Sequence, residues 1–161
     1  MFSGKSTFII DKVMNMENDN LLVVKHHSDV RYGAEGIISH DKKMVDAIKL
    51  TTLESIFDME EYEKINTILI DEGQFFPDLF DFVKNALYDD KEIYVAGLIS
   101  DFRMMPFENM SKLFPLANDI IFKKGKCDCG NDSSFSKRIT NSDKKILVGS
   151  RGYRAVCRNC F

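Results

Sequence analysis

The chain opens on Met1-Phe2-Ser3-Gly4-Lys5-Ser6-Thr7, which contains the second half of the phosphate-binding loop pattern G-x-x-x-x-G-K-[ST]. In such a loop, backbone N–H groups surround the phosphates, the lysine reaches the β and γ oxygens, and the hydroxyl ligates Mg²⁺. The first glycine of the pattern and the strand that feeds the loop would lie upstream of Met1. Taken alone, Gly4-Lys5-Ser6 is equally compatible with an ordinary helix start that carries a surface lysine.

A carboxylate pair supplies a second element of a nucleotide site. Asp71 follows the apolar run Ile68-Leu69-Ile70, which is the position of a Walker B carboxylate that holds Mg²⁺ or its waters. The alternative for such a residue is a helix N-cap, but together with Lys5 it favours ATP or GTP binding. Glu72 can polarise an attacking water, as in hydrolases, or accept the proton of an attacking hydroxyl. The pair alone does not separate hydrolysis from transfer to an acceptor.

The apolar pattern around these motifs predicts an α/β fold. Helical spacing covers residues 5–18, and further helices are predicted from Pro77 and over 106–117. Short apolar runs predict strands at 21–24, 65–70 and 93–98, and the run 120–122 is a candidate for a fourth. Strands that alternate with helices indicate a parallel sheet with helices on both faces, whose ligands bind beyond the carboxyl ends of the strands.

Length and charge narrow the class of protein. The 161 residues, 18.5 kDa in mass, fit one domain or one domain with a small appendage. A net charge of -3 and a pI near 5.6 argue against a dedicated nucleic-acid binder. We find no apolar run of about 18 residues and no signal-peptide pattern, so we expect a cytoplasmic protein without membrane association.

The four cysteines all lie in the last quarter of the chain, where residues 123–161 read as a small β-rich appendage. Two close pairs in a reducing compartment indicate metal ligands rather than disulfides. Structural zinc commonly uses two C-x₂₋₄-C knuckles; Cys157-x-x-Cys160 fits this spacing, whereas Cys127-x-Cys129 is one residue short. The shorter pair can chelate if the backbone turns sharply, which Gly130 favours. The alternative is a set of free or partly oxidised thiols.

Several blocks of sequence closely resemble the type II thymidine kinase family of animals, many bacteria and poxviruses. The opening stretch and Asp71-Glu72-Gly73-Gln74-Phe75-Phe76-Pro77-Asp78 carry the resemblance first. Three further blocks follow in family order: Asp29-Val30-Arg31-Tyr32, Ala96-Gly97-Leu98 through Asp101-Phe102 to Pro106-Phe107, and Tyr153-Arg154-Ala155-Val156-Cys157-Arg158-Asn159-Cys160. These blocks span essentially the whole chain. The resemblance implies a P-loop (RecA-like) nucleotide-binding domain at 1–122 and a zinc-bound lasso domain at 123–161 that closes over a nucleoside.

The family's activity implies transfer of the γ-phosphate of ATP to the 5′-hydroxyl of thymidine, a step of pyrimidine deoxynucleoside salvage. By resemblance Glu72 is the general base, and Arg31 lies near the reacting phosphate. The residues implied to bind ATP and Mg²⁺ are Ser3, Gly4, Lys5, Ser6, Thr7, Asp71 and Gln74. Those implied to bind the nucleoside are Met1, Asp29, Phe75, Leu98, Phe102, Phe107, Ser136 and Tyr153. Core packing is the alternative for each phenylalanine taken singly.

The resemblance also implies recognition of the thymine by backbone groups of a loop over residues 135–153, feedback inhibition by thymidine triphosphate (dTTP), a homotetramer and structural Zn²⁺ on the four cysteines. The departures from the family are the shorter first cysteine pair and the absent first glycine and first strand. Two other readings stay open. One is a P-loop ATPase or binding switch whose zinc module touches nucleic acid, and the other is an inactive truncated homologue.

Overall fold

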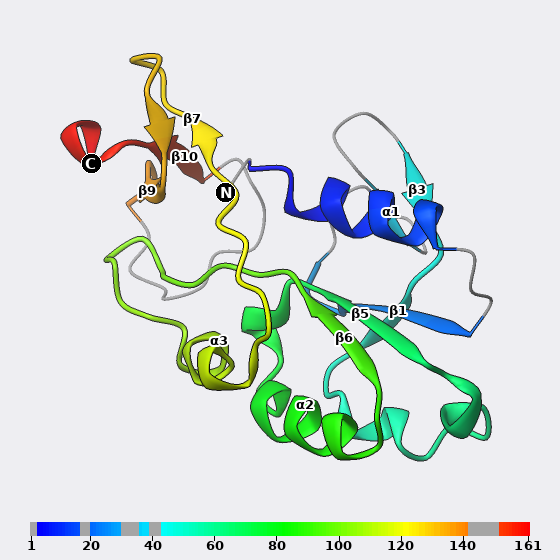
Figure 1. Cartoon of the computed structure of the whole chain (residues 1–161). Coiled ribbons are helices and arrows are strands. Elements are labelled where there is room, and N and C mark those ends of the chain that lie inside the picture. The colour runs from blue at the N-terminus through cyan, green and yellow to red at the C-terminus, as the bar shows by residue number, and fades with distance from the viewer. Residues whose placement is uncertain (1–2, 17–19, 30–35, 39–42, 142–151) are drawn as a thin grey trace.

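A four-stranded parallel sheet forms the centre of the molecule, in the order β4-β1-β5-β6 (Figure 1). The computed structural model describes residues 3–16, 20–29, 36–38, 43–141 and 152–161. The strands are β1 (Leu21–His26), β4 (Ile48–Leu50), β5 (Thr67–Asp71) and β6 (Glu92–Val95). In β5 every residue is buried, as expected for a central parallel strand covered on both faces.

Helices cover both faces of this sheet, which confirms the predicted α/β class (Figure 1). Helix α1 (Lys5–Asn15) buries Ile9 and Ile10 in a cluster with Val23 and Leu69. Helix α2 (Leu79–Tyr88) packs on the other face, where alternate strand residues such as Ile70 join the larger cluster. Because strand side chains alternate between faces, one apolar strand serves both clusters. None of the described helices is long and apolar enough to cross a bilayer.

Short elements complete the described part of the chain. The two-residue strands β2 (Ile37–Ile38) and β3 (Met44–Val45) pair antiparallel, and α3 (Glu108–Lys112) packs beside α2. Two antiparallel ribbons form the C-terminal part: β7 (Gly125–Lys126) with β8 (Asp132–Ser133), and β9 (Phe135–Arg138) with β10 (Tyr153–Val156). Single 3₁₀ turns occupy Glu54–Ile56, Tyr62–Lys64, Gly73–Phe75, Phe114–Leu116 and Arg158–Cys160.

The structure corrects several sequence-based predictions of elements and their boundaries. The run Ile120-Ile121-Phe122 is not a strand but an exposed segment, with Phe122 62% exposed. A strand needs a neighbour to accept its hydrogen bonds, and in the described ranges none pairs with this segment. The predicted strand at 93–98 ends at Val95, and the predicted helix at 106–117 divides into α3 and a 3₁₀ turn that contains Pro115. The three-residue strand β4 was not predicted, because it is too short to show alternation.

Candidate functional site

The start of α1 meets the end of β5. Gly4 adopts the left-handed conformation (φ 76°, ψ 26°) and its carbonyl accepts the N–H of Phe8 at 3.0 Å, which begins the helix. The Ser6 hydroxyl donates to Oδ2 of Asp71 at 2.8 Å, across 65 positions of sequence. The free N–H groups and positive dipole of a helix N-terminus favour an anion here. The structure therefore brings Ser6 of the loop to Asp71, the strand-end carboxylate that the sequence singled out.

Glu72 lies directly beyond Asp71 in an uncommon backbone conformation. Its φ of 56° and ψ of 40° are left-handed, which costs about 1–3 kcal/mol for a residue other than glycine. Its N–H donates to Oδ1 of Asp71 at 3.0 Å, and the N–H of Gly73 donates to the Ala96 carbonyl at 2.9 Å. These bonds hold the turn at the carboxyl end of the sheet, where ligands of open α/β sheets bind. Such strain is concentrated at functional sites.

Gln74 joins the Glu72 carboxylate to the next strand end. Its Nε2 donates to Oε2 of Glu72 at 2.5 Å, and its Oε1 accepts the N–H of Leu98 at 2.9 Å. Gln74 is 6% exposed, and its bond to Glu72 lies in the interior whereas its bond to Leu98 is partly buried. Through these two hydrogen bonds, Gln74 fixes the orientation of the Glu72 carboxylate. Gly97 leaves room for this amide, because a Cβ there would come within 2.8 Å of Oε1.

The structure brings two of the predicted nucleoside-binding aromatics together. Phe102, in the segment after β6, and Tyr153, on β10, both contact the guanidinium of Arg138, whose Cζ lies 3.7 Å from the Phe102 ring centroid. Ser136 is buried on β9 and pairs with Ala155 across the ribbon.

Of the other predicted pocket residues, Leu98 and Phe75 follow strands β6 and β5, and Phe107 directly precedes helix α3. The backbone N–H of Leu98 donates to the Gln74 side chain, which places Leu98 beside the Glu72 turn. Phe107 caps α3 and packs at the edge of the large core cluster, and Phe75 lies 5.7 Å from the His26 ring, centroid to centroid.

Some predicted residues cannot be placed in this arrangement. Met1, Arg31 and most of the predicted thymine loop lie outside the described residues. Asp29 is 9% exposed and its N–H donates to the His26 carbonyl at 2.9 Å. Ser3, Lys5 and Thr7 are half-buried around the start of α1. Their roles as ligands remain predictions.

The four cysteines form a cluster in which all four sulfur atoms lie within 4.8 Å of one another, and Sγ of Cys129 is 3.6 Å from that of Cys157. Tetrahedral zinc with Zn–S bonds of about 2.3 Å requires S···S separations of about 3.8 Å, so the donor set fits a structural metal. The shorter Cys127–Cys129 pair is accommodated by a tight turn. Gly130 has φ 89° and its N–H donates to the Cys127 carbonyl at 2.8 Å, as expected from sequence.

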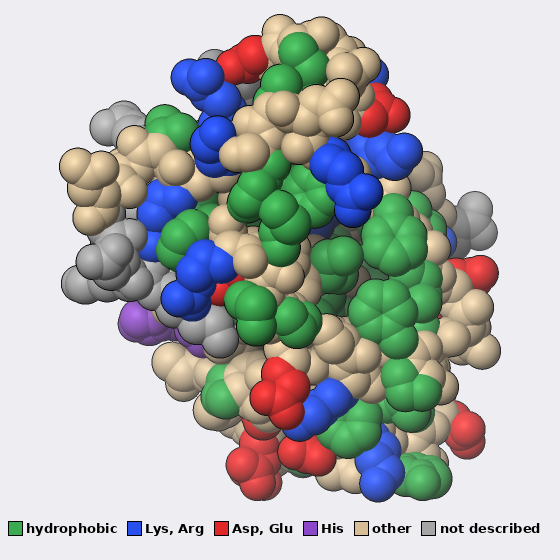
Figure 2. All heavy atoms as spheres, turned by 90° about the vertical axis from the view of Figure 1, so that its left-hand side faces the viewer, with side chains coloured by type: hydrophobic (Ala, Val, Ile, Leu, Met, Phe, Trp, Pro, Cys, Tyr) green, Lys and Arg blue, Asp and Glu red, His purple; other side chains and the backbone are tan. Residues whose placement is uncertain are grey.

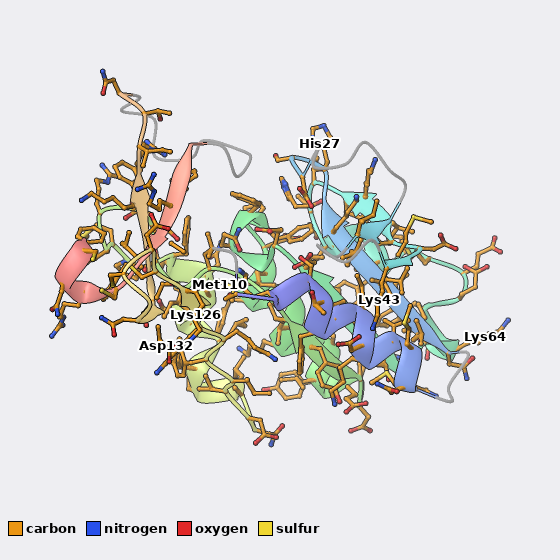
Figure 3. All side chains as sticks on the ribbon, turned by 90° about the horizontal axis from the view of Figure 1, so that it is seen from above. His27, Lys43, Lys64, Met110, Lys126 and Asp132 are labelled. Carbon is orange, nitrogen blue, oxygen red and sulfur yellow. The ribbon has the colours of Figure 1, made fainter. Side chains whose placement is uncertain are left out.

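Thiol acidity is uneven in this cluster: hydrogen bonds with the thiols of Cys129, Cys157 and Cys127 raise the pKa of Cys160, whereas the pKa of Cys127 is lowered. Hydrogen bonds from the backbone N–H groups of Cys129 and Cys157 lower the pKa of the Cys127 thiol to about 6. Thiolates are the form that binds zinc. A salt bridge beside the cluster, from Lys126 to Asp132 at 2.7 Å, joins β7 to β8 (Figure 3).

The sequence reasoning missed two cations near the site. Lys25 is 1% exposed at the end of β1, in register with Asp71, and its Nζ donates to the Gly36 carbonyl. A lysine that ends an apolar run was the only signal for it, and such a lysine usually faces solvent. Arg138 gave no periodic signal, because it lies in a segment that reads as loop.

Comparisons with known proteins point to one family. The family model described as "TK: Thymidine kinase" matches residues 1–161. The chain is 37% identical to the thymidine kinase of Myxoma virus (strain Lausanne) over 165 aligned positions, which cover 100% of this chain and 91% of the viral protein. It is 36% identical to the Monkeypox virus thymidine kinase and 35% identical to that of Vaccinia virus (strain Western Reserve), in each case over 100% of this chain and 92% of the relative.

Proposed function

The chain belongs to the thymidine kinase family, and from this premise we propose that it transfers the γ-phosphate of ATP to the 5′-hydroxyl of thymidine. The single observation that carries the proposal is the bond between Ser6 and Asp71, with Glu72 adjacent to it. This contact supports a shared position for phosphates, metal and general base at the carboxyl end of the sheet.

The residues present suit the donor nucleotide and Mg²⁺. The Lys5 ammonium and the N–H groups at the start of α1 would bind the phosphates, and the Ser6 hydroxyl and Asp71 carboxylate would hold the ion. A hydroxyl and a carboxylate are the oxygen ligands that Mg²⁺ takes in P-loop proteins. When bound, Mg²⁺ neutralises charge on the transferred group. Little covalent help is needed in phosphoryl transfer, so positioning and charge neutralisation supply most of the rate.

Glu72 is the residue we propose as general base. Its carboxylate is held by Gln74 at 2.5 Å and is 7% exposed, so its orientation is fixed before an acceptor binds. We propose that it accepts the proton of the thymidine 5′-hydroxyl as oxygen attacks phosphorus. For Arg31, which lies outside the described residues, the resemblance implies a place near the reacting phosphate, and we propose it as the second catalytic residue.

The C-terminal part would enclose the nucleoside. We infer that residues 1–122 bind the nucleotide and that residues 123–161 form a zinc-bound lasso over thymidine. Phe102 of the first part and Tyr153 of the second would line the nucleoside pocket. All four thiols of the cysteine cluster are available to one metal, which leaves no ligand position for water and makes a bound Zn²⁺ structural. Feedback inhibition by dTTP and a homotetramer are further proposals that the family supports.

An assay of ADP release with and without thymidine tests the proposal. We expect release that depends on thymidine and is accompanied by formation of thymidine monophosphate. Release that is independent of any acceptor would instead support a P-loop ATPase. No release from a folded protein that contains zinc would indicate an inactive homologue.

A further inference from the structure

Arg138 connects the C-terminal ribbon to the nucleotide-binding part through an aromatic stack. Its Cζ lies 3.7 Å from the centroid of the Phe102 ring and 5.1 Å from that of Tyr153, and its Nη2 donates to the Tyr153 hydroxyl. Tyr153 is also its direct cross-strand partner in the β9–β10 pairing. The contact with Phe102 therefore joins two parts of the molecule, whereas the contact with Tyr153 lies within one ribbon.

Phe102 is presented to Arg138 by a tight turn. The Asp101 carboxylate is 6% exposed and accepts the N–H groups of Arg103 at 2.8 Å and Met105 at 3.0 Å. Burial raises the pKa of Asp101, but these bonds and the Arg103 guanidinium outweigh it and hold the pKa below its usual value. The carboxylate thus stays ionised and fixes the turn on which Phe102 stands.

Two other arginines nearby, Arg103 and Arg154, do not connect the Phe102 turn to the C-terminal ribbon in the same way. Arg103 also contacts the Phe102 ring, at a longer 5.2 Å, but it belongs to the same turn and is paired with Asp101. Arg154 is on β10 next to Tyr153 and forms an exposed salt bridge with Asp128. On the face that Figure 2 shows, basic side chains lie around a group of hydrophobic ones. Among the cation–ring contacts of the described residues, Arg138 is the cation that lies over two rings from different segments.

We propose that Arg138 is a positioning residue for the nucleoside: its guanidinium sets the separation of the Phe102 and Tyr153 rings, and so the width of the pocket that takes the flat base. This inference rests on the proposed function, in which both rings contact thymidine. A planar guanidinium stacks on a ring and donates in its own plane at the same time. A lysine keeps the charge but cannot do both.

The test compares Arg138→Lys and Arg138→Met with the matched controls Arg154→Lys and Arg154→Met. We measure the KM for thymidine, the KM for ATP, kcat, and the thymidine Kd by calorimetry, which needs no turnover. For both Arg138 variants we expect the thymidine KM and Kd to rise about 2- to 30-fold, the range that cation–π contacts allow, with the KM for ATP unchanged. The Arg154 variants should match the wild type in all four values.

A second pair of measurements separates positioning from a loss of folding. Zinc content and the midpoint of thermal unfolding should stay near wild type in Arg138→Lys. Arg138→Lys combined with Tyr153→Phe should raise the Kd by less than the product of the two single effects, because the two residues share one contact.

Three results would overturn the inference: a thymidine Kd that is unchanged in both Arg138 variants, a Kd that falls because the guanidinium competes with the base, or equal rises in the KM for thymidine and ATP. A wild type that binds thymidine without phosphorylating it would refute the proposed function alone, and the Kd values would still decide the inference. A wild type that neither binds nor phosphorylates thymidine refutes both.

Discussion

The side-chain amide of Gln74 donates to the Glu72 carboxylate at 2.5 Å and at the same time accepts the N–H of Leu98 at 2.9 Å. One buried side chain thus couples the proposed base at the end of β5 to the segment that follows β6. The orientation of Glu72 depends on where the neighbouring strand ends, and not only on its own turn.

Replacing Glu72 with Gln should lower kcat by about 10²- to 10⁴-fold, the usual contribution of a matched general base. The substitution keeps the size of the side chain, so the Kd for ADP measured by calorimetry should change little. Glu108→Gln is the control, because Glu108 is exposed and forms a salt bridge with Lys112 on the same helix. A Glu72→Gln enzyme with wild-type kcat would exclude Glu72 as the base.

Substituting Gly97 by Ala should displace Gln74 and reduce both stability and turnover. The added Cβ would lie 2.8 Å from Oε1 of Gln74 and 2.9 Å from two atoms of Met110. Overpacking of this kind typically costs about 1–3 kcal/mol, which urea unfolding would measure. The double variant Gly97→Ala/Met110→Ala removes the clash with the Met110 side chain. Compared with Gly97→Ala, it should regain part of the stability but not kcat, because the clash with Gln74 remains. Met110→Ala alone is the control, and full recovery of kcat in the double variant would contradict this account.

Cys129→Ser tests the proposed zinc site and should lower both the zinc content and the midpoint of thermal unfolding. A structural zinc takes four ligands, and a site with three thiolates loses much of the binding energy that would also stabilise the fold. Metal content of the purified protein, measured by atomic emission, tests this directly. Asp128→Asn is the control. Asp128 lies between Cys127 and Cys129 in the sequence, but its side chain is exposed and forms a salt bridge with Arg154. Zinc retained at wild-type content in Cys129→Ser would show that the cluster is not the metal site.

Lowering the pH should destabilise the protein through His26. Burial, followed by the charge of His27, lowers the pKa of His26 below its ordinary 6.5, while a backbone hydrogen bond with Thr51 and the charge of Asp78 oppose the shift. The folded state therefore favours neutral His26. Its contribution is fully present above pH 6.5 and is lost as the pH falls through the folded-state pKa.

Urea unfolding at several pH values between 7 and 5 measures this effect. His26→Phe keeps a ring against Phe76, whose centroid lies 4.8 Å away, and cannot titrate. The free energy of unfolding of the His26→Phe variant should decline less steeply with falling pH than that of the wild type. His27→Gln is the control, and equal pH slopes for His26→Phe and the wild type would show that another group is responsible.

The sequence by itself determined the fold class and predicted the chemistry of the site. Alternating apolar runs at strand and helix spacing gave a parallel α/β sheet, because that periodicity is a local property of the chain. The residues of the phosphate loop, the strand-end pair Asp71 and Glu72, and the four cysteines were likewise readable, since each motif lies within a few consecutive positions. The resemblance to thymidine kinases depended on the order of these motifs.

Only the tertiary structure decided how distant segments meet. The bond from Ser6 to Asp71, the link from Gln74 to Leu98 and the stack of Arg138 on Phe102 join residues far apart in sequence or in separate elements. The apolar run at 120–122 remained unpaired among the described residues although its composition suits a strand. A strand is completed by hydrogen bonds to another segment, so its formation depends on a neighbour that its own residues do not specify.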